Sequence, residues 1–189
     1  KQYQSFLPKK ISTFVDLGFY DGLTSYEFLR LFPKIKEIIA IEPFSLQKNI
    51  FIKFLKNKTK FRHLKIAASN LKKTGKIYID TTPSANSVKF KTNKFKIINF
   101  EKLDSKIKKL EDNSFIKFDI EGGELDAIKG MSKIILNFKP YMAVSIYHGD
   151  KDFYEIPYYL IKKYKDIYNF EIRHYSYGYN ETVLYALPK

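Results

Sequence analysis

The sequence predicts an α/β fold, in which crossover helices connect the strands of a sheet. Short β-like apolar runs alternate along the chain with longer stretches of helical spacing. The chain has 189 residues, 44% of them hydrophobic, which suits one domain over residues 1–189 with a core of its own. Residue 1 is lysine instead of methionine, so we expect that residues before Lys1 are missing from this sequence.

The first half of the chain contains two strand–helix units followed by a less regular segment. Residues 13–17 are an apolar run that ends at Gly18, as a buried strand would, and residues 24–32 have helical spacing before Pro33. The same signals recur in the second unit and then become weaker. We therefore expect a strand over residues 37–41, a helix over residues 46–55, and strands over residues 61–66, 76–80 and 94–99.

The second half begins with a short basic amphipathic stretch, residues 103–110, which predicts a helix. Its strands end in polar residues, as the carboxyl ends of buried strands at a binding site often do. The expected strands cover residues 114–119, 141–146, 170–173 and 182–187, and the expected helices cover residues 124–137, interrupted near Gly130, and 153–164, which contains Pro157.

The composition limits the function classes. The net charge is +14, but arginine occurs only at positions 30, 62 and 173, whereas proteins that read phosphates and base edges draw heavily on arginine. We interpret the lysine excess as a compositional bias, compatible with an anionic substrate, and expect no nucleic-acid partner. The lysines at 106, 108 and 109 could support weak association with anionic lipids, although a solvated helix face explains them better.

Two absences bear on the compartment. The chain has no cysteine, which excludes disulfides and thiolate metal sites and fits a reducing compartment. No apolar run approaches the roughly 18 residues that a membrane span needs. We therefore expect a cytoplasmic location. Nothing in the sequence indicates an oligomeric state.

The turn after the first strand predicts a nucleoside cofactor. It reads Asp-x-Gly-x-x-x-Gly from Asp16 to Gly22, and Glu42 directly follows the second strand, where an acid accepts ribose hydroxyls. The turn lacks the Gly-x-Gly-x-x-Gly pattern of pyrophosphate sites, and Asp21 would repel a pyrophosphate. Asp16 would instead face the positively charged methionyl end of S-adenosylmethionine. In the alternative interpretation the glycines only serve a tight turn and Glu42 caps a helix.

A second acidic turn supplies candidate catalytic residues. Asp119, Glu121 and Glu124 follow one strand, and His148 lies past the end of the adjacent predicted strand. A hydroxyl acceptor must lose its proton near the transition state, so we predict His148 or Asp119 as the general base and Glu121 as the group that orients the acceptor. Glu124 is explained better as a helix N-terminal charge. A divalent ion held by Asp119, Glu121 and His148 is the less favoured alternative, because no H-x-x-H or D-x-D spacing recurs, and we predict no metal ligand.

These residues resemble those of the FkbM-type methyltransferases over nearly the whole chain. The resemblance is densest in residues 14–25 with residues 40–43, and in residues 116–125 with Leu103-Asp104, Lys129-Gly130 and Lys139-Pro140. It implies a Rossmann-like class I methyltransferase fold, with a seven-stranded, mostly parallel sheet and helices on both faces. It also implies S-adenosylmethionine as cofactor and methyl transfer, usually to an oxygen of a sugar, a polyketide or another small molecule. Tyr20 departs from the glycine or small polar residue that many methyltransferases carry there, which concerns the shape of the methionine pocket.

The resemblance assigns the cofactor residues by position. Asp16, Gly18, Tyr20, Gly22 and Thr24 would line the methionyl end, and Phe19, Asp21 and Ser25 of the same block complete this group. Glu42 would bind the ribose, Pro43, Phe44, Ala67 and Ala68 would surround the adenine, and Asp119 would face the reacting methyl group.

The sequence therefore favours an S-adenosylmethionine-dependent O-methyltransferase that acts on a small molecule, such as a sugar, or on a glycan or secondary-metabolite precursor. Two alternatives stay open. One is an RNA methyltransferase, which would use the lysine excess, and the other is a non-catalytic module that binds S-adenosylmethionine.

Overall fold

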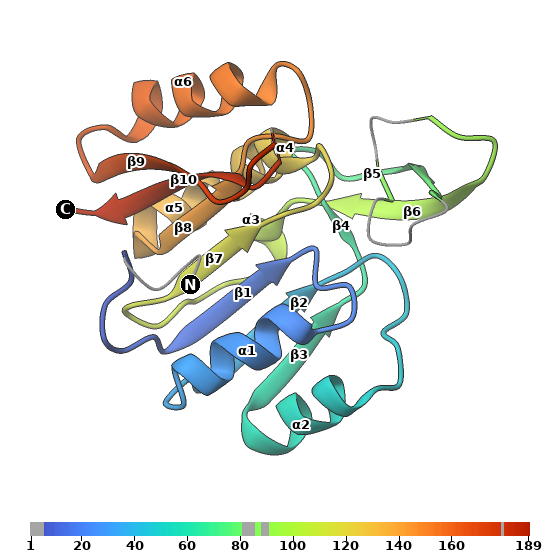
Figure 1. Cartoon of the computed structure of the whole chain (residues 1–189), viewed down its shortest axis with the longest axis horizontal. Helices are drawn as coiled ribbons and strands as arrows, with labels where there is room; N and C mark the ends of the chain where they lie inside the picture. Colours follow the sequence, from blue (N-terminus) through green and yellow to red (C-terminus); the bar gives the residue numbers. More distant parts are fainter. Residues whose placement is uncertain (1–5, 81–85, 88–90, 179) are drawn as a thin grey trace.

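The computed structural model describes residues 6–80, 86–87, 91–178 and 180–189. Figure 1 shows a central twisted sheet with helices on both faces and a smaller sheet that projects from one edge. The strands are β1 (Thr13–Leu17), β2 (Glu37–Ile41), β3 (Lys60–Leu64), β4 (Ala67–Ala68), β5 (Lys73–Tyr78), β6 (Phe95–Glu101), β7 (Phe115–Phe118), β8 (Tyr141–Ser145), β9 (Tyr168–His174) and β10 (Thr182–Pro188). The helices are α1 (Leu23–Leu31), α2 (Ile50–Lys58), α3 (Leu103–Lys106), α4 (Glu124–Lys129), α5 (Ser132–Phe138) and α6 (Asp152–Tyr164).

The central sheet has seven strands in the order β3-β2-β1-β7-β8-β10-β9. The pairs from β3 to β8 are parallel, and β10 runs antiparallel to both β8 and β9. This topology confirms the predicted Rossmann-like, mostly parallel sheet. The chain moves outward from β1 to β3 and then returns to place β7 on the other side of β1. Ligands of such sheets bind at the carboxyl ends of the strands beside this reversal.

Each face of the sheet has its own core because successive strand residues point to opposite faces. Val15 and Leu17 of β1 belong to the cluster that includes residues of α3, α4, α5 and α6. Phe14 belongs to the other cluster, with residues of α1 and α2. The same alternation puts Asp16 on the α1 face of the sheet, although its side chain is charged and fully buried. A buried carboxylate needs partners, and these lie in the site described below.

Two expected helices begin or end differently in the structure. The helix expected over residues 46–55 begins only at Ile50, because the Asn49 side chain accepts the Ile52 N–H and caps the first turn. The helix expected over residues 103–110 ends at Lys106. Beyond it the chain is extended at Ile107, and both Ile107 and Leu110 are buried in the core. Burial of these two side chains therefore outweighs the helical pattern.

The small sheet was not foreseen as a separate layer. Its order is β4-β6-β5, with β5 and β6 forming an antiparallel hairpin. The hairpin stands beyond the carboxyl ends of β1 and β7 (Figure 1), so its inner residues can wall a site at that edge. Within the described ranges, no helix combines the length and hydropathy that crossing a bilayer requires.

Candidate active site

Two turns meet at the carboxyl ends of β1 and β7. Gly18 follows β1 with a φ of 80°, and a Cβ atom placed on it would lie 1.8 Å from the carbonyl oxygen of Asp119. The backbones of the two turns are therefore in contact at a distance that only glycine permits. Tyr20 and Glu121, one in each turn, also have positive φ values of 51° and 56°. Backbone strain of this kind persists where the surrounding structure enforces it, and it concentrates at functional sites.

Beneath the turns, Lys117 of β7 joins two carboxylates. Its Nζ lies 3.2 Å from Asp16 Oδ1 and 3.4 Å from Asp119 Oδ2, and Ser25 of α1 donates a hydrogen bond to Asp16 Oδ2. Asp16 and Lys117 are paired in the register of the parallel strands. Burial raises the pKa of Asp16, and Lys117 and Ser25 oppose that effect. The ion pair between Asp16 and Lys117 thus forms the buried base of the site, beneath the two turns.

Glu42 is held at the end of β2 by two backbone groups. Its Oε2 accepts the Tyr20 N–H and its Oε1 accepts the Phe44 N–H, both at 3.1 Å. Burial raises the pKa of this carboxyl, and the two backbone hydrogen bonds oppose the rise. A carboxylate has about four lone-pair positions, so Glu42 retains the capacity to accept hydroxyl groups of a ligand.

One cavity of about 660 Å³ joins these features. Its volume lies within the roughly 300–1,000 Å³ of small-molecule sites. Eight residues predicted to bind the cofactor line it: Gly18, Tyr20, Glu42, Pro43, Phe44, Ala67, Ala68 and Asp119. The lining also includes Lys73, Lys76 and Lys96 of the β5–β6 hairpin. Ser87, which lies between these strands, donates a hydrogen bond to the carbonyl of Glu121 and so ties the hairpin to the second turn.

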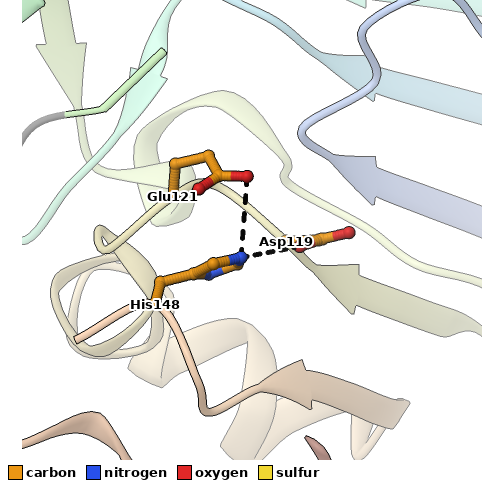
Figure 2. A group of neighbouring side chains, drawn as sticks. All are labelled: Asp119, Glu121 and His148. Atoms are coloured by element: carbon orange, nitrogen blue, oxygen red, sulfur yellow. Dashed lines mark ion pairs between the residues drawn. The ribbon is translucent and has the colours of Figure 1, made fainter. Parts of the chain in front are cut away.

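The three predicted catalytic residues come together beside this cavity. Figure 2 shows His148, which follows β8, pointing toward Asp119 at the end of β7 and Glu121 in the next turn. His148 Nε2 lies 3.3 Å from Asp119 Oδ1 and 3.6 Å from Glu121 Oε1. Ser145 also donates a hydrogen bond to Asp119 Oδ1. Asp119 and Glu121 line the cavity, so chemistry at the cluster can reach a bound molecule.

Glu124 lies behind this cluster and determines its charge. Its Oε1 is 2.8 Å from His148 Nδ1 and accepts the Ile120 N–H, while its Oε2 accepts the Gly122 N–H. Burial would lower the pKa of His148, but the hydrogen bond to Glu124 and the charges of Glu124, Asp119 and Glu121 together raise it to about 9. Burial raises the pKa of Glu121, opposed by His148. The arrangement therefore favours a positive charge on or near His148 Nε2.

The other predicted cofactor residues lie behind the cavity wall or at the start of α1. Asp16 and Ser25 hydrogen bond to each other beneath the turn, and Phe19 is buried against Phe61. Asp21 Oδ1 accepts the Leu23 N–H at the start of α1. Gly22 is the N-cap of that helix with a φ of 85°, and Thr24 lies in its first turn. These residues therefore support the conformation of the first turn and the start of α1.

Sequence reasoning missed Lys117 and the second role of Glu124. Lys117 interrupts an otherwise apolar buried strand, and a lysine in that position signals a buried carboxylate partner. Glu124 does stand in the first turn of α4, as expected, but it is fully buried and orients His148 as well. The three hairpin lysines were not foreseen because the sequence predicted two strands flanking a loop but not the position of these strands beside the cavity.

Comparisons with known proteins bear on the fold and the family of the chain. A search of the curated proteins finds no match to the chain. Among solved structures, a methyltransferase FkbM from Methylobacillus flagellatus KT superposes with a TM-score of 0.66 and 22% identity, covering 93% of this chain and 43% of its own. An rRNA methylase from Streptococcus thermophilus superposes with a TM-score of 0.57 and 13% identity, covering 97% of this chain and 89% of its own. At these identities the similarity shows the fold, and the chain spans less than half of the first structure.

The family itself follows from the sequence model of the methyltransferase FkbM domain, which matches residues 16–179. The match begins at Asp16 and includes Glu42, the Asp119 turn and His148. The chain therefore belongs to the FkbM family of methyltransferases, which the resemblance had predicted.

Proposed function

We propose that the chain is an S-adenosylmethionine-dependent O-methyltransferase whose acceptor is a hydroxyl group of a small molecule, such as a sugar, or of a glycan or secondary-metabolite precursor. The observation that carries the proposal is that one cavity is lined both by Glu42 from the end of β2 and by Asp119 and Glu121 from the end of β7. One carboxylate is available for a nucleoside, and the other two are available for the reacting groups.

The residues of the cavity fit the proposed cofactor. Glu42 can accept ribose hydroxyls while Tyr20 and Phe44 hold it in place. Ala67 and Ala68, with Pro43 and Phe44, supply apolar surface for an adenine ring. When bound, S-adenosylmethionine supplies a methyl group on a positively charged sulfur, and the carboxylate of Asp119 suits such a charge.

The cluster around His148 would act on the acceptor. Methyl transfer mainly requires that the acceptor oxygen be held in line with the methyl group and away from water. Glu121 would orient the hydroxyl, and Asp119, or His148 after it has lost its own proton, would take the hydroxyl proton as the new bond to oxygen forms. Two of these side chains are anchored: Asp119 by Ser145 and Lys117, and His148 by Glu124.

The hairpin lysines favour an acceptor that carries negative charge. Lys73, Lys76 and Lys96 line the cavity, and their ammonium groups lie over the rings of Phe100, Phe95 and Phe44, respectively. Because these contacts leave the ammonium donors available to a ligand, a phosphate-bearing sugar would find both hydroxyl and charge partners in one cavity.

The test combines cofactor binding with turnover. Calorimetry should show binding of S-adenosylmethionine, and a panel of sugar nucleotides and glycan precursors should give S-adenosylhomocysteine with at least one acceptor. His148→Ala should retain cofactor affinity and lose turnover by about 10²-fold or more, whereas Asp119→Asn should lose turnover to a similar extent and also weaken cofactor binding. His174→Ala is the control, because His174 contacts Thr182 on β10. Absence of cofactor binding would contradict the function, and unchanged turnover in both variants would contradict the residue roles.

The lysines also favour a second candidate, methyl transfer to RNA, because they add to a net charge of +14. Incorporation of methyl groups into RNA separates the two candidates. A chain that binds the cofactor tightly but turns over neither class of acceptor would instead be a binding module.

A further inference from the structure

A buried nitrogen of His148 lacks a hydrogen-bond partner, although two carboxylate oxygens lie 3.3 and 3.6 Å from it. The side chain is only 5% exposed, yet Nε2 accepts or donates no hydrogen bond within the described part of the chain. It points toward the carboxylates of Asp119 and Glu121 (Figure 2), which are 31% and 28% exposed. A buried polar atom left unpaired costs about 1–3 kcal/mol, so the geometry calls for an occupant between the three side chains.

The opposite nitrogen shows which atom faces that position. Glu124 is fully buried, and its two carboxyl oxygens accept the N–H groups of Ile120 and Gly122, so they are oriented as acceptors. His148 Nδ1, 2.8 Å from Glu124 Oε1, therefore carries a hydrogen, and the lone pair of a neutral imidazole lies on Nε2. A carboxylate behind a histidine in this way is the arrangement that orients metal-binding imidazoles.

The spacing of the three side chains also suits a metal ion. One potential ligand atom from each of Asp119, Glu121 and His148 lies within 4.8 Å of the others. Ligand atoms bound at about 2.0–2.2 Å from one ion lie roughly 3–4 Å apart, and the two distances from Nε2, 3.3 and 3.6 Å, fall in that range.

We propose that Asp119, Glu121 and His148 bind a divalent cation of the Mn²⁺ type through one imidazole nitrogen and two carboxylate oxygens. Carboxylates suit Mg²⁺ and Mn²⁺ and imidazole suits the transition metals, so Mn²⁺ satisfies both preferences. The surroundings are strongly negative, because Asp16 and Glu124 add their charges and Lys117 alone opposes them among the contacts described for this cluster. The proposal departs from the sequence-based expectation of no metal ligand. The three residues come close together because β7 and β8 are neighbours in the sheet, which the spacing in the sequence does not show.

The role of the cation rests on the proposed O-methyl transfer. An acceptor hydroxyl bound to the cation would have a lower pKa, and its proton would pass to the second carboxylate oxygen of Glu121. The acceptor oxygen would form its bond to the methyl carbon while the carbon–sulfur bond breaks and leaves its electrons on sulfur. His148 would then be a ligand, and Glu121 would be the proton acceptor.

The binding test uses Mn²⁺ alone, with neither cofactor nor acceptor. Chelator-treated and dialysed protein is titrated with Mn²⁺ while free Mn²⁺ is followed by electron paramagnetic resonance and heat by calorimetry. We expect one site per chain. Glu121→Gln should lose it, and Glu124→Gln should weaken it by about 10–100-fold. The control is Asp126→Asn, because Asp126 lines the cavity but contacts Asn70 and not His148.

Several outcomes are decisive. Absence of Mn²⁺ binding in the wild-type chain, or equal binding in Glu121→Gln, would overturn the metal site. Glu121 is part-exposed and lies outside the Glu124 hydrogen bonds, so its variant should fold, which circular dichroism checks. Turnover that persists after chelation would overturn the catalytic role of the cation while leaving methyl transfer intact. Mn²⁺ binding without any methyl transfer would leave the site standing and contradict the proposed function.

Discussion

Glu42 combines burial with a role that requires ionisation. Only the carboxylate can accept both backbone N–H groups and the hydroxyls of a ribose, yet burial raises its pKa above the ordinary value. The hydrogen bonds from Tyr20 and Phe44 recover part of that cost. The affinity for the cofactor should therefore begin to fall at a higher pH than the ionisation of an exposed glutamate would predict.

We expect the affinity for S-adenosylmethionine to be full above the raised pKa of Glu42 and to fall as the pH decreases through it. Glu42→Gln should bind S-adenosylmethionine about 10–100-fold more weakly at neutral pH, because it loses hydrogen bonds to a charged group. The decrease in its affinity at acidic pH should disappear. Calorimetry across the pH range measures both effects. Glu27→Gln, at an exposed position of α1, serves as the control, and an unchanged pH dependence in Glu42→Gln would contradict the assignment.

Gly18 illustrates how little space separates the two turns. Gly18→Ala would bring a Cβ to 1.8 Å from the Asp119 carbonyl oxygen at a φ of 80°. We expect a loss of about 2 kcal/mol or more in the free energy of unfolding, which lowers Tm by roughly 4–8 °C in a chain of this size. Gly178→Ala is the matched control, since nothing lies within 4 Å of a Cβ there. Equal Tm values for the two variants would show that the turns can separate freely.

At the scale of elements, the contact between β1 and β7 is electrostatic as well as hydrogen bonded. Asp16 and Lys117 face each other across the pair, and both are buried. Removing one partner of a buried ion pair leaves an uncompensated charge, whereas removing both costs less. The pair therefore matters for the register and stability of the two strands that carry the site.

Chemical denaturation of single and double variants measures this pairing. Lys117→Met should lower the free energy of unfolding by about 3–5 kcal/mol. Adding Asp16→Asn should restore part of the loss, with a coupling of about 0.5–3 kcal/mol. Strict additivity of the two changes would show that Asp16 and Lys117 do not stabilise each other.

The elements were largely predictable from the sequence, whereas their contacts were not. Apolar runs indicated the strands of the central sheet, and the two acidic turns indicated its ligand-binding edge. The start of α2 depends on a cap, Asn49, whose side chain also reaches the Asp21 carbonyl. The link between Glu124 and His148 depends on β7 and β8 being neighbours, which local patterns do not encode. Asp104 of the family motif proves to accept the backbone N–H groups of Lys133 and Ile134 at the start of α5.

For the whole molecule, the question is what the surplus of positive charge attracts. Lysines occur throughout the chain, and three of them line the cavity. Charge spread in this way produces weak, sequence-independent binding of polyanions that salt removes. A local set of ammonium groups can instead act on one small anion.

We expect single-stranded RNA to bind weakly and to dissociate as salt rises from about 50 to 200 mM, without receiving methyl groups. Radiolabelled S-adenosylmethionine, offered together with RNA and with the small-acceptor panel, measures where the methyl groups go. Label in the small acceptors alone would agree with the proposed function. Label in RNA would assign the lysines to a nucleic-acid surface instead.

The close approach of Gly18 to Asp119 has a thermodynamic consequence. The first turn adjoins Glu42 and the second carries Asp119 and Glu121, so a molecule that shifts either turn must shift the other. Occupancy of the nucleoside side and of the acceptor side of the cavity is then linked, and linkage is reciprocal. The factor by which bound cofactor changes the affinity for the acceptor must therefore equal the factor by which bound acceptor changes the affinity for the cofactor.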